Sequence, residues 1–282
     1  MHIEKGKLRK IFLLVLKYIF LCFILFLVFY PIIGVLFGSF KTQSEYLQTK
    51  SMTPPVDWGN IENYITVFTK GNVGIGFKNT LIIIIIACFT STITNTMVAY
   101  CLTRFDFKYR NIIDRFYMIA SFVPSVIVHL IIFKDFAHIG LINNLGSIVI
   151  LYTGVDVVTL YLYKQYLNEI PVAIDESAIL DGCSYFRIYW NILLPMIKPA
   201  ITTACIIKTT YIYNDFYTAM LYLPDDKKGV MSTVLYRFIG PYSSQWSVIA
   251  AGILVVTLPI FIGFLFAQKQ IYAGFAAGAV KG

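Results

Sequence analysis

The stretch that decides the fold is residues 79–103, NTLIIIIIACFTSTITNTMVAYCLT, which contain no charged side chain. A helix needs about 20 mainly apolar residues to cross the hydrocarbon core of a bilayer. Unpaired backbone groups are too costly in lipid, so a segment that crosses it must satisfy its own hydrogen bonds as a helix. The stretch therefore predicts a transmembrane helix.

The composition of the whole chain agrees with a membrane protein. Of its 282 residues, 58% are hydrophobic and 13% are charged, whereas soluble domains carry about 25% charged residues. The net charge of +8 does not indicate a nucleic-acid partner, because the basic residues cluster beside apolar runs, as in cytoplasmic loops. No pair of the five cysteines has C-x-x-C spacing, so no metal site is predicted.

The apolar segments predict an all-α membrane protein with six transmembrane helices. The third segment contains Pro124, Asp156 interrupts the fourth, and the fifth carries Lys208 and Asp215. The six predicted spans are residues 11–38, 79–103, 116–133, 141–163, 200–223 and 246–267.

The distribution of Lys and Arg predicts that both termini are cytoplasmic. With the N-terminus inside, the inner segments hold 13 Lys and Arg and the outer segments hold 8, over equal lengths. An excess of basic residues marks the cytoplasmic side. Six spans then return the C-terminus to the cytoplasm, and residues 164–198 form the longest cytoplasmic loop.

This loop contains DESAILDGCSYFRIYWNILLP, residues 175–195. Pro171 is suited to open a helix, and Gly182 to end it in the left-handed conformation. Ser184 is a good N-cap for a second helix, which Pro195 is expected to end. The loop therefore predicts two short helices that meet at a sharp bend.

Two interpretations of the bent pair follow from physical chemistry alone. A small bent helix can dock in a groove of a partner protein. Alternatively, its aromatic side chains lie in the headgroup region of the bilayer. The second helix would present an apolar stripe, because four large apolar side chains recur at helical spacing: Phe186, Tyr189, Trp190 and Leu193.

The loop resembles the signature of permease subunits of binding-protein-dependent ABC importers. That pattern is Glu-Ala-Ala, three residues, Gly, nine residues and Ile-x-Leu-Pro. The chain has Glu176-Ser177-Ala178, then Gly182, then residues 192–195, ILLP; Ser177 departs from the usual Ala. Further similar segments are VAYCLTRFDFKYR (98–110), YNDF (213–216) and the tail GFAAGAVKG (274–282). The tail and the six-span plan resemble the second permease of maltose-type carbohydrate importers.

The resemblance implies the type I ABC importer permease fold in the bacterial cytoplasmic membrane. It also implies a division of the chain into four parts. These are a cytoplasmic N-terminus with the first span (1–40), an extracytoplasmic loop (41–75), a five-span core with the coupling loop 164–198 (76–267), and a cytoplasmic tail (268–282).

The resemblance further implies a permease that imports a sugar or oligosaccharide. The expected partners are a second homologous permease, two ATPase subunits and an extracytoplasmic solute-binding protein, besides membrane lipid. No cofactor is expected on this chain, and it is not expected to be an enzyme, because it lacks a Walker-type phosphate loop and ATP is used by the partner subunits.

The residues implied to couple to the ATPases lie in the loop and in the tail. Those of the loop are Glu176, Ser177, Ala178, Asp181, Gly182, Ile192, Leu194 and Pro195. Those of the tail are Gly278, Ala279, Val280, Lys281 and Gly282. Substrate-binding residues are not predicted.

The main alternative is an ion-coupled secondary transporter, which needs ionisable groups within the membrane. Asp156, Lys208, Asp215 and His129 are candidates for that role. A membrane scaffold without transport activity would explain neither the loop motif nor the tail.

Overall fold

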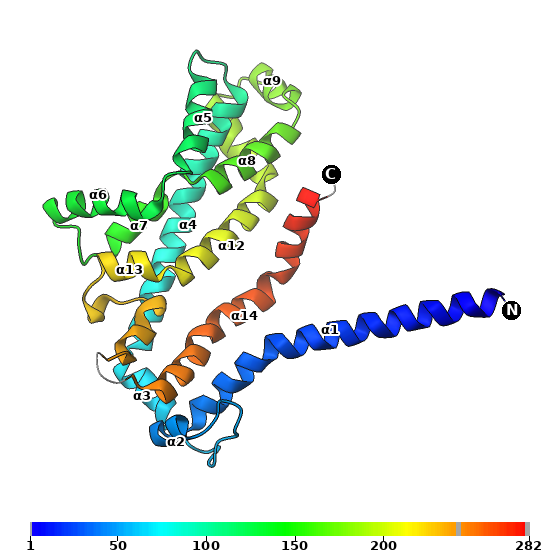
Figure 1. Ribbon diagram of the computed structural model, residues 1–282. Helices are drawn as coiled ribbons and strands as arrows, with labels where there is room; N and C mark the ends of the chain where they lie inside the picture. Colours follow the sequence, from blue (N-terminus) through cyan, green and yellow to red (C-terminus); the bar gives the residue numbers. More distant parts are fainter. Residues whose placement is uncertain (1, 241–243, 280–282) are drawn as a thin grey trace. The chain divides into compact units, whose positions relative to one another are not determined.

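The structure is a computed structural model that describes residues 2–240 and 244–279, and within these ranges the chain forms helices and no β-strand (Figure 1). Its three longest helices are α1 (His2–Phe40), α4 (Val73–Arg104) and α14 (Trp246–Ala279). Each is long and apolar enough to cross a membrane. The first, second and sixth predicted spans are therefore single helices.

Three further pairs of helices are apolar and long enough to cross a membrane when the two helices of each pair are taken together, and they are bent by 99°, 42° and 74° in chain order. If each pair is one span, the chain crosses the membrane up to six times. The first pair is α5 (Arg110–Ala120) with α6 (Ser125–His138), and the second is α7 (Leu145–Thr153) with α8 (Val157–Glu169). The third pair is Tyr185–Met196 with α12 (Lys198–Asn214). Of this pair, only α12 overlaps the predicted fifth span, and Tyr185–Met196 lies in the predicted loop 164–198.

The predicted third span, residues 116–133, is not a single helix. Helix α5 ends at Ala120, and Pro124 is the N-cap residue of α6, with ψ of 124°. A proline disfavours the helical conformation in the residue before it and cannot continue a helix, so the chain turns sharply at this point.

Two aspartates also interrupt predicted spans, and both serve as helix caps. Asp156, which interrupts the fourth predicted span, accepts a hydrogen bond from the N–H of Thr159 at 2.9 Å and is the N-cap of α8. The fifth span ends earlier than predicted, because Asp215 accepts from the N–H of Thr218 at 2.9 Å and begins α13 (Phe216–Tyr222). A short acidic side chain competes for backbone donors and favours a new N-terminus.

The chain divides into two compact units. Unit 1 comprises Met1–Gly71 and Leu235–Thr257. In it, the predicted loop 41–75 forms α2 (Gln43–Gln48) and α3 (Glu62–Lys70). The buried Lys41 donates from Nζ to the Thr49 hydroxyl at 2.8 Å, and Asn63 donates to the carbonyls of Ser39 and Lys41 at 2.8 Å each. These bonds give the loop a defined fold.

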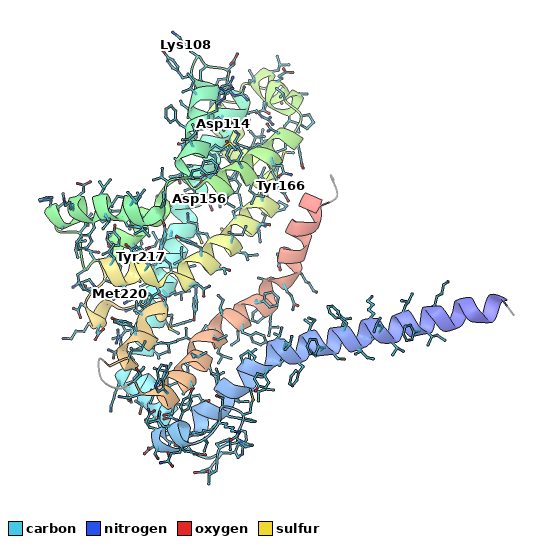
Figure 2. All side chains as sticks on the ribbon, in the orientation of Figure 1. Lys108, Asp114, Asp156, Tyr166, Tyr217 and Met220 are labelled. Atoms are coloured by element: carbon cyan, nitrogen blue, oxygen red, sulfur yellow. The ribbon has the colours of Figure 1, made fainter. Side chains whose placement is uncertain are left out.

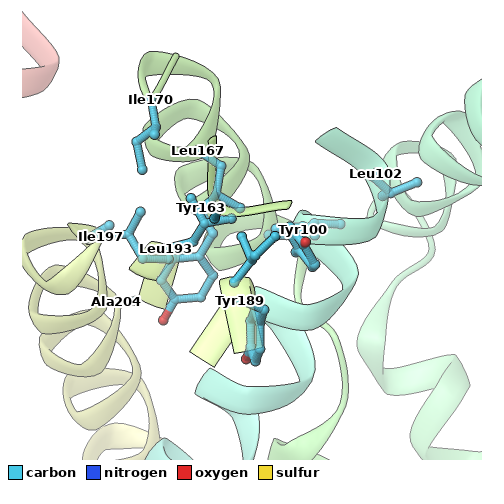
Figure 3. Close-up of a cluster of buried hydrophobic side chains, with 14 residues drawn as sticks. Tyr100, Leu102, Tyr163, Leu167, Ile170, Tyr189, Leu193, Ile197 and Ala204 are labelled. Atoms are coloured by element: carbon cyan, nitrogen blue, oxygen red, sulfur yellow. The ribbon is translucent and has the colours of Figure 1, made fainter. Parts of the chain in front are cut away.

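Unit 2 comprises Asn72–Val234 and Leu258–Gly282 and holds two apolar clusters. Cluster A joins α4 and α8 to the segment 170–204, and Figure 3 shows its side chains. Cluster B joins α4 to α7, α12 and α13. The remaining elements are α9 (Ala173–Leu180), α10 (Tyr185–Ile188), the π-helix η1 (Tyr189–Leu193), α11 (Leu194–Met196), and the 3₁₀ helices η2 (Asp226–Lys228) and η3 (Met231–Phe238).

The sixth predicted span continues as a helix well beyond its expected end at residue 267. Helix α14 extends to Ala279, so residues 268–279 of the predicted cytoplasmic tail are helical, including Gly278. Val280, Lys281 and Gly282, which the resemblance assigns to ATPase contact, lie outside the described residues.

Candidate functional site

The candidate coupling segment begins with helix α9. It starts at Ala173 rather than at Pro171, so the prediction that proline occupies the first helical position is wrong. Instead, the carbonyl of Pro171 accepts a hydrogen bond from the N–H of Ile174 at 3.2 Å. Asp175 and Glu176 lie in the first turn, where negative charge is favourable.

The predicted glycine stop is confirmed. Gly182 has φ of 80°, in the left-handed region. Its N–H donates to the carbonyl of Ile179, and the N–H of Cys183 donates to that of Ala178, both at 2.9 Å. These bonds occupy carbonyls that the end of the helix leaves unpaired. A Cβ built at Gly182 meets no atom within 4 Å, so the conformation, and not the space in this chain, requires glycine.

The predicted cap of the second helix is also confirmed, because Ser184 accepts from the N–H of Arg187 at 3.4 Å. The expected stop at Pro195 is wrong. The N–H of Leu194 bonds to the carbonyl of Tyr189, which makes a π turn before the proline, and the helix continues to Met196. The bend falls at Ile197, with φ of −91° and ψ of 15°. A wider turn helps a helix to accommodate a residue without an N–H.

The predicted coupling residues separate into an outward and an inward group. Ala178 is buried and Ile192 and Leu194 are half-buried, so these three anchor the segment. The outward group is Glu176, Ser177, Asp181, Gly182 and Pro195, all exposed. Beside its carboxylates, Leu180 is 88% exposed. This tip offers negative charge and apolar surface to a partner.

A buried ion pair ties α9 to α4. Nε of Arg104, the last residue of α4, lies 3.2 Å from Oδ2 of Asp175, and the two side chains are 7% and 10% exposed. Nη2 of Arg104 also donates to the carbonyl of Ile170 at 2.9 Å. The sequence motifs contain both residues, but nothing in their spacing indicates that they pair.

Cluster A holds the second helix of the segment against the same end of α4 (Figure 3). Tyr189 and Leu193 point into this cluster beside Tyr100, and all three are buried. The hydroxyl groups of Tyr189 and Thr96 share a hydrogen bond of 2.8 Å. The predicted aromatic stripe is therefore divided, because Phe186 and Trp190 are exposed and stack on each other instead.

The four ionisable residues that an ion-coupled transporter would need have partners within the chain. Nζ of Lys208 lies 3.0 Å from Oδ2 of Asp156. Asp215 accepts from the Tyr152 hydroxyl at 2.8 Å. Nδ1 of His129 lies 3.3 Å from a tyrosine hydroxyl, that of Tyr222. Each of the four side chains thus has a partner within the chain.

Comparisons with known proteins agree with the motifs and the fold. The family model described as "Binding-protein-dependent transport system inner membrane component" matches residues 92–270. The "Probable starch degradation products transport system permease protein AmyC" of Thermoanaerobacterium thermosulfurigenes is 32% identical, with 89% of this chain and 91% of AmyC covered. The "Arabinooligosaccharides transport system permease protein AraQ" of Bacillus subtilis is 29% identical, with 90% of each chain covered.

Among solved structures, a chain of a bacterial ABC transporter that imports the acidic polysaccharide alginate has the same fold. The TM-score is 0.78 at 21% sequence identity, with 90% of this chain and 95% of that chain covered. The bent helix pairs are therefore placed within a known permease architecture.

Proposed function

The chain belongs to the family of inner membrane components of binding-protein-dependent transport systems, and on this premise we propose that it is a permease subunit for oligosaccharides. It is a multi-pass protein of the cytoplasmic membrane with the type I ABC importer fold. The observation that carries the sugar assignment is similarity over about nine-tenths of the chain to permeases named for starch products and arabino-oligosaccharides.

The proposed transporter contains further subunits. A second, homologous permease forms the translocation path with this chain, an extracytoplasmic binding protein delivers the sugar, and two ATPase subunits hydrolyse ATP. This chain then contributes no catalytic residue and binds no cofactor of its own. Gly278–Gly282 are a second proposed contact with the ATPases.

The exposed tip of the coupling segment, Glu176 to Gly182, is the proposed seat of an ATPase subunit. Its acidic and apolar surface is suited to a groove with a basic rim. The buried Asp175–Arg104 pair at its base would transmit a displacement of α9 to the long helix α4. ATP-driven movement of the tip then reorients the membrane helices.

Uptake by a strain that lacks only this chain tests the proposed function. The panel consists of radiolabelled maltotriose, arabinotriose, raffinose, trehalose and, as a control, methionine. We expect the deletion to abolish uptake of at least one sugar, and a plasmid copy to restore it, while methionine uptake is unchanged. Unaltered uptake of every sugar would contradict the assignment.

The orientation of the chain has its own test. In a variant whose five cysteines are replaced by serine, a cysteine at Asp57 should react with a membrane-impermeant maleimide in whole cells. A cysteine at Lys281 should react only after the membrane is opened, because the excess of Lys and Arg predicts that both termini are inside. Labelling of position 281 in sealed cells would overturn the topology.

A further inference from the structure

Unit 2 contains two adjoining cavities that are lined by polar as well as apolar side chains. The first has a volume of about 410 Å³ and is lined by Asp156, Lys208 and Tyr211 among others. The second, of about 760 Å³, shares His129 and Tyr211 with it and adds Tyr217. Figure 2 labels Asp156 and Tyr217, one from each cavity. Both volumes lie within the range of about 300–1,000 Å³ that is typical of small-molecule sites.

The first cavity lies at a polar layer between the two apolar clusters. On α12, Lys208 stands between Ala204 of cluster A and Ile212 of cluster B. Asp156 stands between Tyr152 of cluster B and Leu160 of cluster A. The charged groups are therefore in the interior of a membrane domain, where ionisable residues are costly and usually functional.

The structure holds the ion pair in place without enclosing it. Asn95 is fully buried, and its Oδ1 accepts from the N–H of Asp156 at 3.1 Å and from the Thr159 hydroxyl at 3.0 Å. The Lys208 side chain is 10% exposed, but that of Asp156 is 39% exposed. The Asp156 carboxylate therefore caps α8 and pairs with Lys208 while it remains accessible from the cavity.

Tyr211 supplies an aromatic surface beside the pair. It lines both cavities, is exposed, and packs edge to face against Tyr152 with ring centroids 6.0 Å apart. The Tyr152 hydroxyl donates a hydrogen bond to Asp215, whereas the Tyr211 side chain is accessible, with 56% of the residue exposed. The cavity thus offers an accessible hydroxyl, a carboxylate and an apolar ring face together.

We propose that this cavity is a subsite on this chain for a neutral sugar in transit, with Asp156, Lys208 and Tyr211 as its contacts. The inference rests on the proposed function. Sugar hydroxyls both donate and accept hydrogen bonds, so they match a carboxylate beside an ammonium group. The apolar face of a sugar ring matches the face of Tyr211. Because the two charges already neutralise each other, the site favours an uncharged polyol over an ion.

The test compares paired neutral variants in the complete transporter, with the panel sugar that gives the highest uptake as the probe. The variant Asp156→Asn/Lys208→Met removes both charges, and Asn retains the capacity to cap α8. We expect its maximal uptake rate to fall about tenfold. The sugar concentration that gives half-maximal uptake should be unchanged, because the binding protein sets it. ATP hydrolysis stimulated by the sugar-loaded binding protein should persist.

A second ion pair in the same unit provides the matched control. Lys164 and Asp114 join α8 to α5 and do not line either cavity. Asp114→Asn/Lys164→Met should therefore transport at the wild-type rate. If the Asp156→Asn/Lys208→Met variant also did so, the pair would be structural only and the proposal would be wrong. Loss of uptake together with loss of stimulated ATP hydrolysis would likewise overturn it, because the pair would then act in the conformational change.

Tyr211 variants decide the question if the charge variants do not accumulate in the membrane. Tyr211→Ala should lower maximal uptake about tenfold, and Tyr211→Phe, which keeps the ring, only about twofold to threefold. Wild-type uptake by Tyr211→Ala would overturn the proposal. A wild-type transporter that imports no panel sugar would instead contradict the proposed function.

Discussion

Glu176→Lys should abolish uptake while the chain still reaches the membrane in normal amount. Glu176 is exposed in the first turn of α9 and has no ion-pair partner among the described residues, so its removal leaves no internal contact broken. At a docked ATPase its carboxylate would be buried against a basic group. Breaking a buried charged pair costs about 3–5 kcal/mol, which weakens the contact more than a hundredfold.

The measurement is sugar uptake together with retention of the ATPase subunit during purification through a tag on this chain. Glu176→Gln is the matched control, because it keeps a hydrogen-bonding side chain. This variant should lose less sugar uptake and less bound ATPase than Glu176→Lys. Full uptake by Glu176→Lys with the ATPase still bound would favour the alternative that the loop lies on the lipid headgroups.

Gly182→Val tests the same segment through the backbone. A β-branched residue at φ of 80° is strained by about 1–2 kcal/mol or more, so the turn should open and α9 should lose its orientation. Gly182→Asn is the control, since asparagine tolerates this region and the surrounding space is open. Uptake should fall about tenfold in the valine variant and little in the asparagine variant.

Asp175→Ala should have the second large effect, and on stability as well as transport. It leaves the guanidinium of Arg104 buried without its counter-charge, which costs about 3–5 kcal/mol. The purified transporter should therefore unfold at a markedly lower denaturant concentration, as followed by tryptophan fluorescence. Arg104→Ala should be similarly destabilising.

The double variant Arg104→Met/Asp175→Leu separates stability from coupling. Replacing both members of a buried pair by apolar residues is often neutral or stabilising, so the resistance to denaturant should recover. If the pair also transmits motion from α9 to α4, uptake should remain low. Recovery of both properties would show that the pair has a structural role alone.

The fold was predictable from sequence where one local rule dominated. The uncharged run of residues 79–103 indicated a long helix, and Gly182 and Ser184 indicated a stop and a cap because each role depends on one residue type. The prediction failed at residues 116–133, where apolar composition outweighed Pro124. Hydropathy measures the affinity of a segment for lipid, and a bent segment has the same hydropathy as a straight one.

The candidate site was only partly predictable, for a related reason. The tip of α9 follows from a contiguous motif, but the Asp175–Arg104 pair and the Asn95–Asp156–Lys208 layer join residues that are distant in sequence. Such contacts depend on how helices pack, and no periodicity in a single sequence encodes them. The prediction therefore identified Asp156 and Lys208 as unusual but not as partners.

Helix α1 has a consequence for how the protein is made. Every side chain from Lys10 to Ile33 is exposed, so packing against other parts of the chain does not stabilise this region of the helix. Its affinity for the hydrocarbon core is sufficient for it to enter the bilayer alone, before the remaining helices have been synthesised. Lys10 and Lys17 lie in its N-terminal half, where basic side chains favour the cytoplasmic side of the membrane, so the same helix also biases the direction in which it is inserted.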